Sequence, residues 1–174
     1  AGNFKTAHSK GVDFLSGYCA VKPAPADIVI TTNGGYPLDQ NAYQCPKGMS
    51  AAEATVNDGG VIIMLATCQD GHGGESYYHS IADAESADAF FQQCLHTPQV
   101  ETLPDQWCAQ IWCRIVRKYK VLFVADKAQE QLIRDLKVEY FETLDEAYAR
   151  ARELKGPDAT LTCIPNGVSV VVKD

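Results

Sequence analysis

The sequence has no run of about 20 consecutive apolar residues, which is the length that a membrane-spanning helix needs. It also has no cluster of Lys and Arg: 15 basic residues are spread through a chain with 22 acidic ones, and the formal net charge is −7. An acidic chain without a basic patch has little attraction for phosphate groups. These absences argue against a membrane protein and against a nucleic-acid-binding protein.

The pattern C-x-x-C is absent, although cysteine occurs seven times at irregular spacing. An odd number of cysteines argues against a complete disulfide framework, and the missing pairs argue against a structural zinc site. We therefore expect free thiols in a reducing compartment and predict a cytoplasmic location. The helical zinc motif H-E-x-x-H is also absent, and we expect no metal ligands in this chain.

What the sequence does contain is a regular alternation of apolar strands and helices. Hydrophobic residues make up 46% of the chain and charged residues 21%, as in an ordinary globular protein. The patterns predict strands over 27–32, 61–67, 121–125 and 138–141, and helices over 3–19, 84–96, 103–119, 127–136 and 144–155. This order is typical of an α/β fold with a mostly parallel sheet that helices cover on both faces.

The C-terminal end of the chain predicts a different local structure. Two short apolar runs, 161–164 and 168–172, flank Pro165-Asn166-Gly167. Asn-Gly between two such runs is a strong signal for a two-residue hairpin turn. We therefore expect an antiparallel β-hairpin at the edge of the sheet.

Polar residues mark several of the expected helix boundaries. Two pairs have the spacing of a capping box: Ser50 with Glu53, and Thr143 with Glu146. Thr102 is the expected N-cap of the helix over 103–119. Pro46 is expected to interrupt the helical segment that begins near Asp39, because proline lacks the N–H that a helix interior requires.

Two glycine-rich loops follow the first two expected strands. One spans 31–39 and contains Asn33, Gly34 and Gly35; the other spans 70–75 and contains His72. In open α/β sheets ligands bind beyond the carboxyl ends of the strands, and glycine lets the backbone approach a ligand closely. Neither loop matches G-x-G-x-x-G or a P-loop, so a conventional dinucleotide site has weak support. The alternative is that both loops are simply tight turns.

Tyr43, Gln44 and Lys47 form a second group of candidate residues. On a helical turn Lys47 lies three and four residues from the other two, so the three side chains can converge. An ammonium and an amide suit a ligand with a carboxylate and a carbonyl or hydroxyl group. The alternative is that Lys47 is a solvated surface charge. Trp107 lies off the centre of its helix's apolar stripe, where it either faces a pocket or packs peripherally.

Residues 26–41, with the unusual sequence ADIVITTNGGYPLDQN, resemble the C-terminal domain of the nickel-dependent lactate racemase family. Shorter matches follow in the same order over about half of the chain: Tyr43-Gln44-x-x-Lys47-Gly48-Met49, Ala51-Ala52-Glu53-Ala54, Gly59-Gly60-Val61-Ile62-Ile63, Asp70-Gly71-His72-Gly73-Gly74-Glu75 and Asp105-Gln106-Trp107. The rest of the chain fits the family in the order of its elements but carries no specific motif.

The resemblance implies a 2-hydroxyacid racemase or epimerase whose nickel pincer nucleotide takes a hydride from the α-carbon and returns it to the other face. It also implies that the cofactor tether, the nickel ligand and the acid/base histidines lie in an N-terminal domain outside this sequence. No catalytic residue and no bound cofactor are therefore expected in this chain. The resemblance assigns Lys47 to the substrate carboxylate or keto oxygen and Gln44 to orienting the substrate. The pocket walls are assigned to Tyr43 and Trp107, and cofactor contacts are predicted for Asn33, Gly34, Gly35 and His72.

We therefore expect residues 1–174 to form one α/β domain, the C-terminal domain of a two-domain racemase. Its expected partners are a small 2-hydroxy acid and its own N-terminal domain. The start at Ala1, with no initiator Met and no signal peptide, fits a piece of a longer protein. Two other classes stay open: a non-catalytic ligand-binding or regulatory α/β domain, and a fragment of a nicotinamide-dependent oxidoreductase. The missing glycine fingerprint disfavours the second of these.

Overall fold

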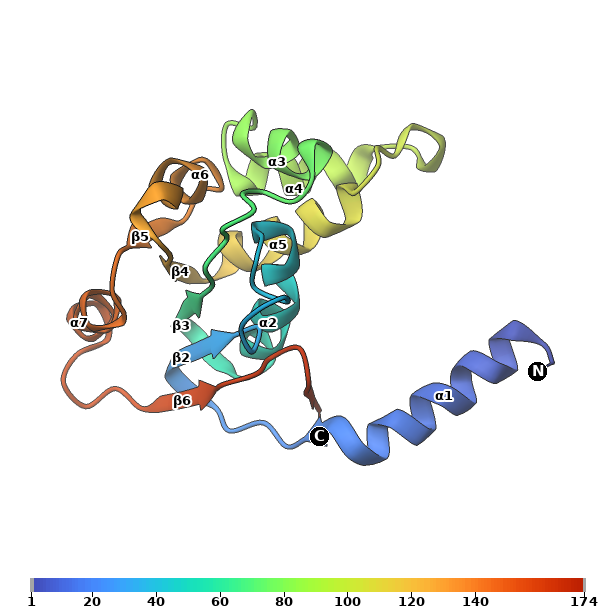
Figure 1. Ribbon diagram of the computed structural model, residues 1–174, viewed down its shortest axis with the longest axis horizontal. Helices are drawn as coiled ribbons and strands as arrows, with labels where there is room; N and C mark the ends of the chain where they lie inside the picture. The colour runs from blue at the N-terminus through green and yellow to red at the C-terminus, as the bar shows by residue number, and fades with distance from the viewer. Residues whose placement is uncertain (1, 174) are drawn as a thin grey trace.

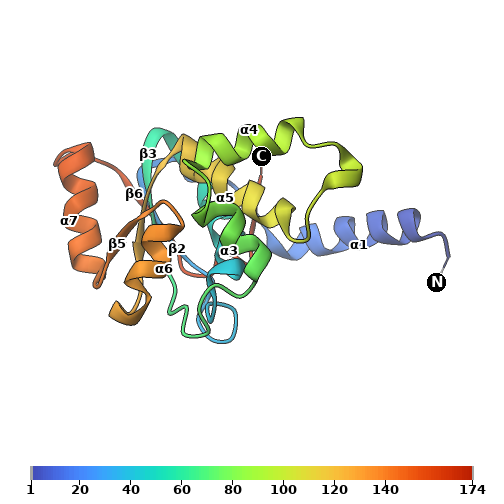
Figure 2. The ribbon, with the colours of Figure 1, turned by 90° about the horizontal axis from the view of Figure 1, so that it is seen from above.

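A computed structural model describes residues 2–173 and has a five-stranded parallel sheet at its centre (Figures 1 and 2). The order of the strands across the sheet is β5-β4-β3-β2-β6, and every neighbouring pair is parallel. The strands are β2 (Ala26–Thr32), β3 (Val56–Leu65), β4 (Lys120–Val124), β5 (Glu139–Phe141) and β6 (Leu161–Ile164). The predicted parallel sheet is thus confirmed.

Helices cover both faces of the sheet, as predicted. The helices of the described residues are α1 (Phe4–Cys19), α2 (Cys45–Glu53), α3 (Glu75–Ala82), α4 (Ala87–His96), α5 (Gln106–Lys118), α6 (Glu130–Asp135) and α7 (Leu144–Lys155), with short 3-10 turns η1 (Ala42–Gln44), η2 (Gln99–Glu101) and η3 (Lys127–Gln129). Figure 2 shows α7 on one face of the sheet and α2 and α5 on the other. Helices α3 and α4 pack against the outer side of α5.

The two faces bury different kinds of side chain. Beneath α5, Trp112 is fully buried next to Phe123, and its Nε1–H donates a 2.9 Å hydrogen bond to the Leu136 carbonyl. Beneath α7, small residues of the helix (Ala147 and Ala151) meet branched side chains of the strands. Alanines on the inner face of α7 let the helix pack closely against the sheet.

The C-terminal hairpin prediction is wrong. Strand β6 pairs parallel with β2, whereas β7 (Val171–Val172) pairs parallel with β1 (Ala20–Val21) in a separate two-stranded sheet. The intervening turn bonds to the end of β2: Gly167 N–H donates to the Thr32 carbonyl at 2.9 Å, and Asn166 forms a bridge with Asn33. The turn keeps one internal bond, from Ser169 N–H to the Asn166 carbonyl at 3.2 Å, but β7 pairs with β1 and not with β6, so no hairpin forms.

Pro46 begins α2 instead of interrupting a helix. It lies in the first turn, where the missing N–H has no intrahelical partner to lose. Ser50 is inside α2 and its Oγ–H donates to the Pro46 carbonyl at 2.7 Å, so Ser50 is not an N-cap. Glu53 forms an ion pair with Arg114 at 2.6 Å instead of completing a capping box. The predicted box at Ser50 is therefore wrong.

The predicted start of α5 at Thr102 is also wrong. The helix begins after Asp105, whose backbone is left-handed with φ of 61°. Gln106 reaches back, and its Oε1 accepts a hydrogen bond from Leu103 N–H at 2.9 Å. A left-handed residue cannot continue a right-handed helix, so no helix joins Thr102 to α5.

Of the two other predicted helix starts, the one near residue 84 is displaced and the one at Thr143 is confirmed. The expected helix over 84–96 starts later, at α4, where Ser86 Oγ accepts a hydrogen bond from Ala89 N–H at 3.1 Å; the preceding α3 was not predicted. The box at α7 is confirmed, with Glu146 N–H to Thr143 Oγ1 at 3.3 Å and Thr143 N–H to Glu146 Oε2 at 3.2 Å.

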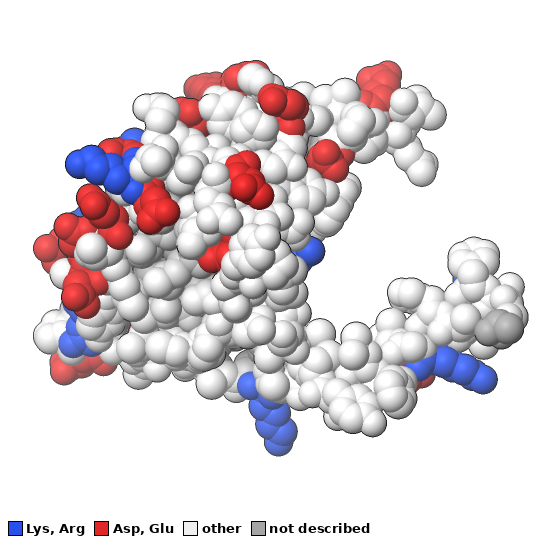
Figure 3. Space-filling view, in the orientation of Figure 1, with Lys and Arg blue, Asp and Glu red and all other residues white. Residues whose placement is uncertain are grey.

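Helix α1 projects from the body of the molecule (Figure 1). None of its residues is buried, and several large apolar side chains on it are exposed: Phe4, Val12, Phe14, Leu15 and Tyr18. No helix among the described residues is long and apolar enough to cross a membrane. On the face drawn in Figure 3, acidic side chains gather near α3, α6 and α7, and basic side chains are few.

Candidate functional site

The two glycine-rich loops lie side by side at the carboxyl ends of β2 and β3. Three backbone hydrogen bonds join the segments that contain them: Asp70 N–H to Gln40 O (2.7 Å), Ala42 N–H to Gly71 O (3.1 Å) and Tyr43 N–H to His72 O (3.0 Å). Their proximity follows from the parallel pairing of β2 with β3, because parallel neighbours end at the same edge of a sheet. The second loop therefore supports the backbone of Tyr43.

Asn33 is fully buried and uses both ends of its amide within the chain. Its Oδ1 accepts from Gly48 N–H at 3.1 Å, and its Nδ2 donates to the Leu38 carbonyl at 2.8 Å. These bonds tie the end of β2 to the start of α2. Gly34 N–H donates to Thr32 Oγ1 at 2.8 Å, and a Cβ at Gly34 would lie 2.7 Å from the Asn166 side chain. The loop is thus shaped by close internal contacts.

Gln44 and Lys47 lie together at the start of α2. The Lys47 ammonium donates to Gln44 Oε1 at 2.5 Å, in agreement with their helical spacing. Since lysine has only donors, this contact fixes the oxygen of the Gln44 amide on Lys47 and leaves the amide NH₂ available to another acceptor. Lys47 is exposed, and among residues 2–173 no carboxylate forms an ion pair with it. The pair therefore offers a cation and an N–H donor to the solvent.

Tyr43, which directly precedes Gln44 in the sequence, forms an aromatic pair with Trp107. Their ring centroids are 6.2 Å apart and the rings are edge-on at 84°. The Tyr43 hydroxyl donates to Asp105 Oδ1 at 3.1 Å. Burial, and then this hydrogen bond, raise the pKa of Tyr43 to about 12, so the phenol is protonated at neutral pH. The Trp107 side chain is mostly exposed, at 58%, and is available to a ligand or another part of the protein.

His72 is half-buried and held in one orientation. Its Nδ1 accepts from Gly74 N–H at 3.1 Å, which places the ring proton of neutral histidine on Nε2. The ring stacks on Tyr78 with centroids 5.1 Å apart, and Nε2 is 3.6 Å from Glu75 Oε1. Within the described part of the chain, no three His, Cys, Asp or Glu side chains come together in an arrangement that suits a metal ion.

The two cysteines beside the candidate residues are buried. Burial raises the pKa of the Cys108 thiol to about 12 and that of the Cys45 thiol well above its usual value. Thiols with such raised pKa values are protonated at neutral pH and are poor nucleophiles. Cys108 instead has a structural contact, because its Sγ–H donates to the Tyr43 carbonyl at 3.4 Å. All seven cysteines are free.

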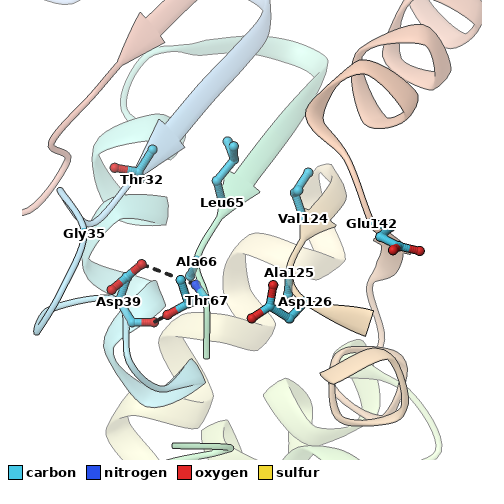
Figure 4. A pocket seen from close by; sticks show the side chains of 10 residues that line it. All are labelled: Thr32, Gly35, Asp39, Leu65, Ala66, Thr67, Val124, Ala125, Asp126 and Glu142. Atoms are coloured by element: carbon cyan, nitrogen blue, oxygen red, sulfur yellow. Dashed lines mark hydrogen bonds between the residues drawn. The ribbon is translucent and has the colours of Figure 1, made fainter. Parts of the chain in front are cut away.

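A cavity of about 320 Å³ lies at the carboxyl ends of β2, β3 and β4 (Figure 4). Its lining includes Gly35 of the first loop together with Leu65, Val124 and Asp126. Figure 4 shows how its wall is built near Asp39, whose carboxylate accepts from Thr67 N–H at 3.3 Å. The cavity is separate from the other candidate positions: Tyr43, Gln44, Lys47, His72 and Trp107 do not line it.

The sequence did not predict the contact between Asp105 and Tyr43. Asp105 is 62 positions from Tyr43 in the chain, so no local pattern connects the two residues. The one available signal was its place in the Asp105-Gln106-Trp107 segment, which carries part of the family resemblance.

The fold and these contacts define a parallel α/β domain with a Lys–Gln pair and an aromatic pair at the edge of the sheet where such folds bind ligands. The chain belongs to the family of lactate racemase C-terminal domains, whose family model matches residues 21–172. The resemblance drawn from the sequence is thereby confirmed.

Two curated relatives and a solved structure agree with this family. The chain is 48% identical over 173 residues to a lactate racemase of Lactiplantibacillus plantarum, and the alignment covers 99% of this chain and 41% of the relative. It is 45% identical over 174 residues to a lactate racemase of Thermoanaerobacterium thermosaccharolyticum, with 100% and 41% coverage. The structure of the lactate racemase apoprotein from T. thermosaccharolyticum matches with a TM-score of 0.91 and 45% identity, over 97% of this chain and 40% of that one. The chain thus spans about two fifths of these relatives.

Proposed function

We propose that this chain is the C-terminal domain of a nickel pincer nucleotide-dependent 2-hydroxyacid racemase of the lactate type, to which it contributes substrate-binding residues. The observation that carries the proposal is the Lys47–Gln44 pair. It is an exposed cation without a carboxylate partner among the described residues, in a chain with a net charge of −7. Such a cation suits a small anionic substrate.

Each residue of the pair has a distinct chemical task in this proposal. Lys47 holds the substrate carboxylate or the oxygen on the α-carbon, which carries alkoxide charge once its proton has been removed and before the α-hydrogen leaves with its electron pair, and again when that hydrogen returns. Gln44 keeps its carbonyl on the Lys47 ammonium and directs its amide N–H at a substrate oxygen. A fixed cation and a fixed donor cost little reorganisation when the charge appears, which is why they favour the transition state.

We propose the nickel cofactor because of the family to which the chain belongs, and not because this chain contains a set of metal ligands. The described residues bring no three metal-ligating side chains together, and the Asn33 amide is already bonded at both ends. The residues present therefore do not fit a nickel-holding site. We propose that the N-terminal domain holds the cofactor, and that Asn33, Gly34, Gly35 and His72 at most border it.

The N-terminal domain of the same polypeptide and a small 2-hydroxy acid are the proposed partners. The exposed apolar side chains of α1 and the mostly exposed Trp107 support an interface with another part of the protein. A cytoplasmic location is proposed on the basis of the seven free cysteines.

Substitution of Lys47 in the full-length protein tests the proposed function. We expect Lys47→Ala to lower kcat/KM for lactate racemisation by roughly 10²–10³, the usual effect of losing one electrostatic donor. Gln44→Ala should lower kcat/KM by a smaller factor, because a neutral hydrogen bond is weaker than a charge-assisted one. Lys47→Arg should restore only part of the activity, since a planar guanidinium differs from a compact ammonium. Steady-state racemisation and thermal melts of each variant provide the measurement.

Lys155→Ala is the matched control, because the Lys155 ammonium donates to the Gly59 carbonyl near the start of β3, at the end of the sheet opposite the motif. It should leave the kinetics unchanged. Near wild-type racemisation by Lys47→Ala would show that this lysine does not bind the substrate.

A further inference from the structure

Asp105 joins the aromatic pair to the start of α5. Its Oδ1 accepts the hydrogen bond from the Tyr43 hydroxyl, and its backbone carbonyl accepts from Cys108 N–H at 2.9 Å and Ala109 N–H at 3.2 Å. Its left-handed backbone turns the chain into the helix, and its side chain makes no capping hydrogen bond to α5. The carboxylate is therefore committed to Tyr43 and not to the helix.

The hydrogen bond to Asp105 has a fixed direction. A carboxylate has no proton to give, and a phenol has one, so Tyr43 donates and Asp105 accepts. Because burial and this bond raise the pKa of Tyr43 to about 12, the arrangement persists at neutral pH. Toward a ligand, the Tyr43 oxygen can then act only as an acceptor. A hydroxyl group can donate to such an oxygen, whereas a carboxylate cannot.

The same residue controls the position of Trp107, which stands two places after it in the chain. The ring of Trp107 meets Tyr43 edge-on at 6.2 Å, and the next residue, Cys108, bonds to the Tyr43 carbonyl. Two independent contacts therefore tie the first turn of α5 to Tyr43. We therefore expect a change at Asp105 to alter the angle between the two rings and the width of the wall that they form.

We propose that Asp105 is a positioning residue that determines substrate specificity in this site. By accepting the hydrogen bond of the Tyr43 hydroxyl, Asp105 leaves the Tyr43 oxygen as an acceptor for the 2-hydroxyl group, so that the substrate carboxylate is left to Lys47. By fixing Tyr43 against Trp107 it sets the size of the side chain that a 2-hydroxy acid can carry. This inference rests on the proposed function, from which it takes the substrate class.

Asp105→Asn separates this role from that of a helix start. Asparagine adopts the left-handed conformation almost as readily as aspartate, so α5 begins in the same way. The charge is lost, and the amide NH₂ can now donate to the Tyr43 oxygen, which reverses the bond. A change in KM or in the preference between substrates, beyond a small change in stability, therefore reports on the Tyr43–Asp105 hydrogen bond.

The test compares Asp105→Asn, Tyr43→Phe and the double variant in the full-length protein, with lactate and with a 2-hydroxy acid of longer alkyl chain. We expect Asp105→Asn to raise KM for lactate about 3–10-fold with a smaller change in kcat, the range for one ordinary hydrogen bond, because the amide replaces a charge-assisted bond by a neutral one. The ratio of kcat/KM for the longer acid to that for lactate should rise. The double variant should be no more than about twofold worse than the poorer single variant, since both changes remove the same interaction.

Asp135→Asn is a matched control, because Asp135 accepts a 2.6 Å hydrogen bond from Tyr78 in the same way. It should change thermal stability but neither KM nor the substrate ratio. Unchanged KM and substrate ratio in Asp105→Asn, or effects of the two single changes that simply add, would overturn the proposal.

A second measurement does not depend on activity. Trp107 is exposed and Trp112 is fully buried, so within this chain acrylamide reaches mainly Trp107, and the difference between each protein and its Trp107→Phe counterpart isolates that signal in the full-length protein. Quenching should increase in Asp105→Asn and stay unchanged in Asp135→Asn; no increase would overturn the positioning role. If the wild-type protein racemises neither acid, the proposed function fails, and the quenching result still decides whether Asp105 positions Trp107.

Discussion

Gly48 occupies a crowded point beneath the candidate site. A Cβ there would lie 2.6 Å from Asn33 Oδ1 and 3.0 Å from the Thr32 carbonyl, and Gly48 Cα is itself 2.7 Å from where a Cβ on Gly167 would be. The end of β2, the start of α2 and the turn after β6 therefore meet at this residue. Because Lys47 precedes it directly, the fit at Gly48 also fixes the position of the ammonium-bearing residue.

We expect Gly48→Ala to lower the free energy of unfolding by about 1–3 kcal/mol, the usual cost of overpacking a tight interior. Chemical denaturation followed by circular dichroism measures the change. Gly11→Ala is the control: Gly11 is in α1 with nothing within 4 Å of the added Cβ, so alanine should be neutral or stabilising by up to about 1 kcal/mol. Equal stability of Gly48→Ala and wild type would mean that the backbone relaxes around the new methyl group.

At the residue scale, the sequence predicts contacts along a helix but not contacts across the fold. The Gln44–Lys47 hydrogen bond follows from a spacing of three residues. The Tyr43–Asp105 bond depends on how α5 packs, and neither residue type nor spacing reveals it. The spacing also singled out Lys47 as able to converge with Tyr43 and Gln44, and the family resemblance then favoured a binding role over a solvated surface charge.

At the scale of single elements, two threonines look alike in sequence and differ in the structure. Thr143 has Glu146 three residues later and forms a complete capping box. Thr102 has Asp105 three residues later, but the left-handed backbone of Asp105 separates it from the helix. The pattern is local, whereas the conformation of Asp105 accompanies its bond to Tyr43 on a distant element. The cap at α7 was therefore predictable and the start of α5 was not.

Thr143→Ala should lower the free energy of unfolding by about 1 kcal/mol, because it leaves a helix N–H without its acceptor. Thr102→Ala should change it by less than about 0.5 kcal/mol, as is usual for an exposed position without a special contact. Urea denaturation of both variants under the same conditions gives the comparison. A larger loss for Thr102→Ala than for Thr143→Ala would contradict this assignment of the caps.

At the scale of the whole molecule, the central parallel sheet was predictable and its C-terminal edge was not. Apolar runs that alternate with helices define parallel strands, because each crossover helix returns the chain to the same end of the sheet. The Asn-Gly turn after β6 gives a correct local signal for a turn. Its partner is decided by distant contacts, since Gly167 bonds to Thr32 and the last strand finds β1. The residues of the turn thus predict that the chain turns after β6, but not which strand the next segment pairs with.

Asp27 connects three strands at the opposite, amino end of the sheet. Its Oδ2 accepts from the Thr160 N–H at 2.9 Å and the Thr160 hydroxyl at 2.8 Å, and its Oδ1 accepts from Asn57 Nδ2 at 3.1 Å. Asp27 begins β2, Asn57 lies in β3 and Thr160 precedes β6. The Thr160 bonds first, and then the Asn57 bond, lower the pKa of the Asp27 carboxyl from 3.8 to about 2.

Because the pKa of Asp27 is lower in the folded protein, its ionised form stabilises the fold. That contribution is complete above about pH 3.8 and is lost as the pH falls toward 2. Asp27→Asn should therefore be less stable than wild type at neutral pH, and the difference should shrink between pH 4 and pH 2. Urea denaturation at a series of pH values measures it. Asp158→Asn is the control, since Asp158 is exposed and has no side-chain hydrogen bond or ion pair within residues 2–173. A stability difference between Asp27→Asn and wild type that is the same at pH 2 and pH 7 would show that ionisation of Asp27 does not connect the strands.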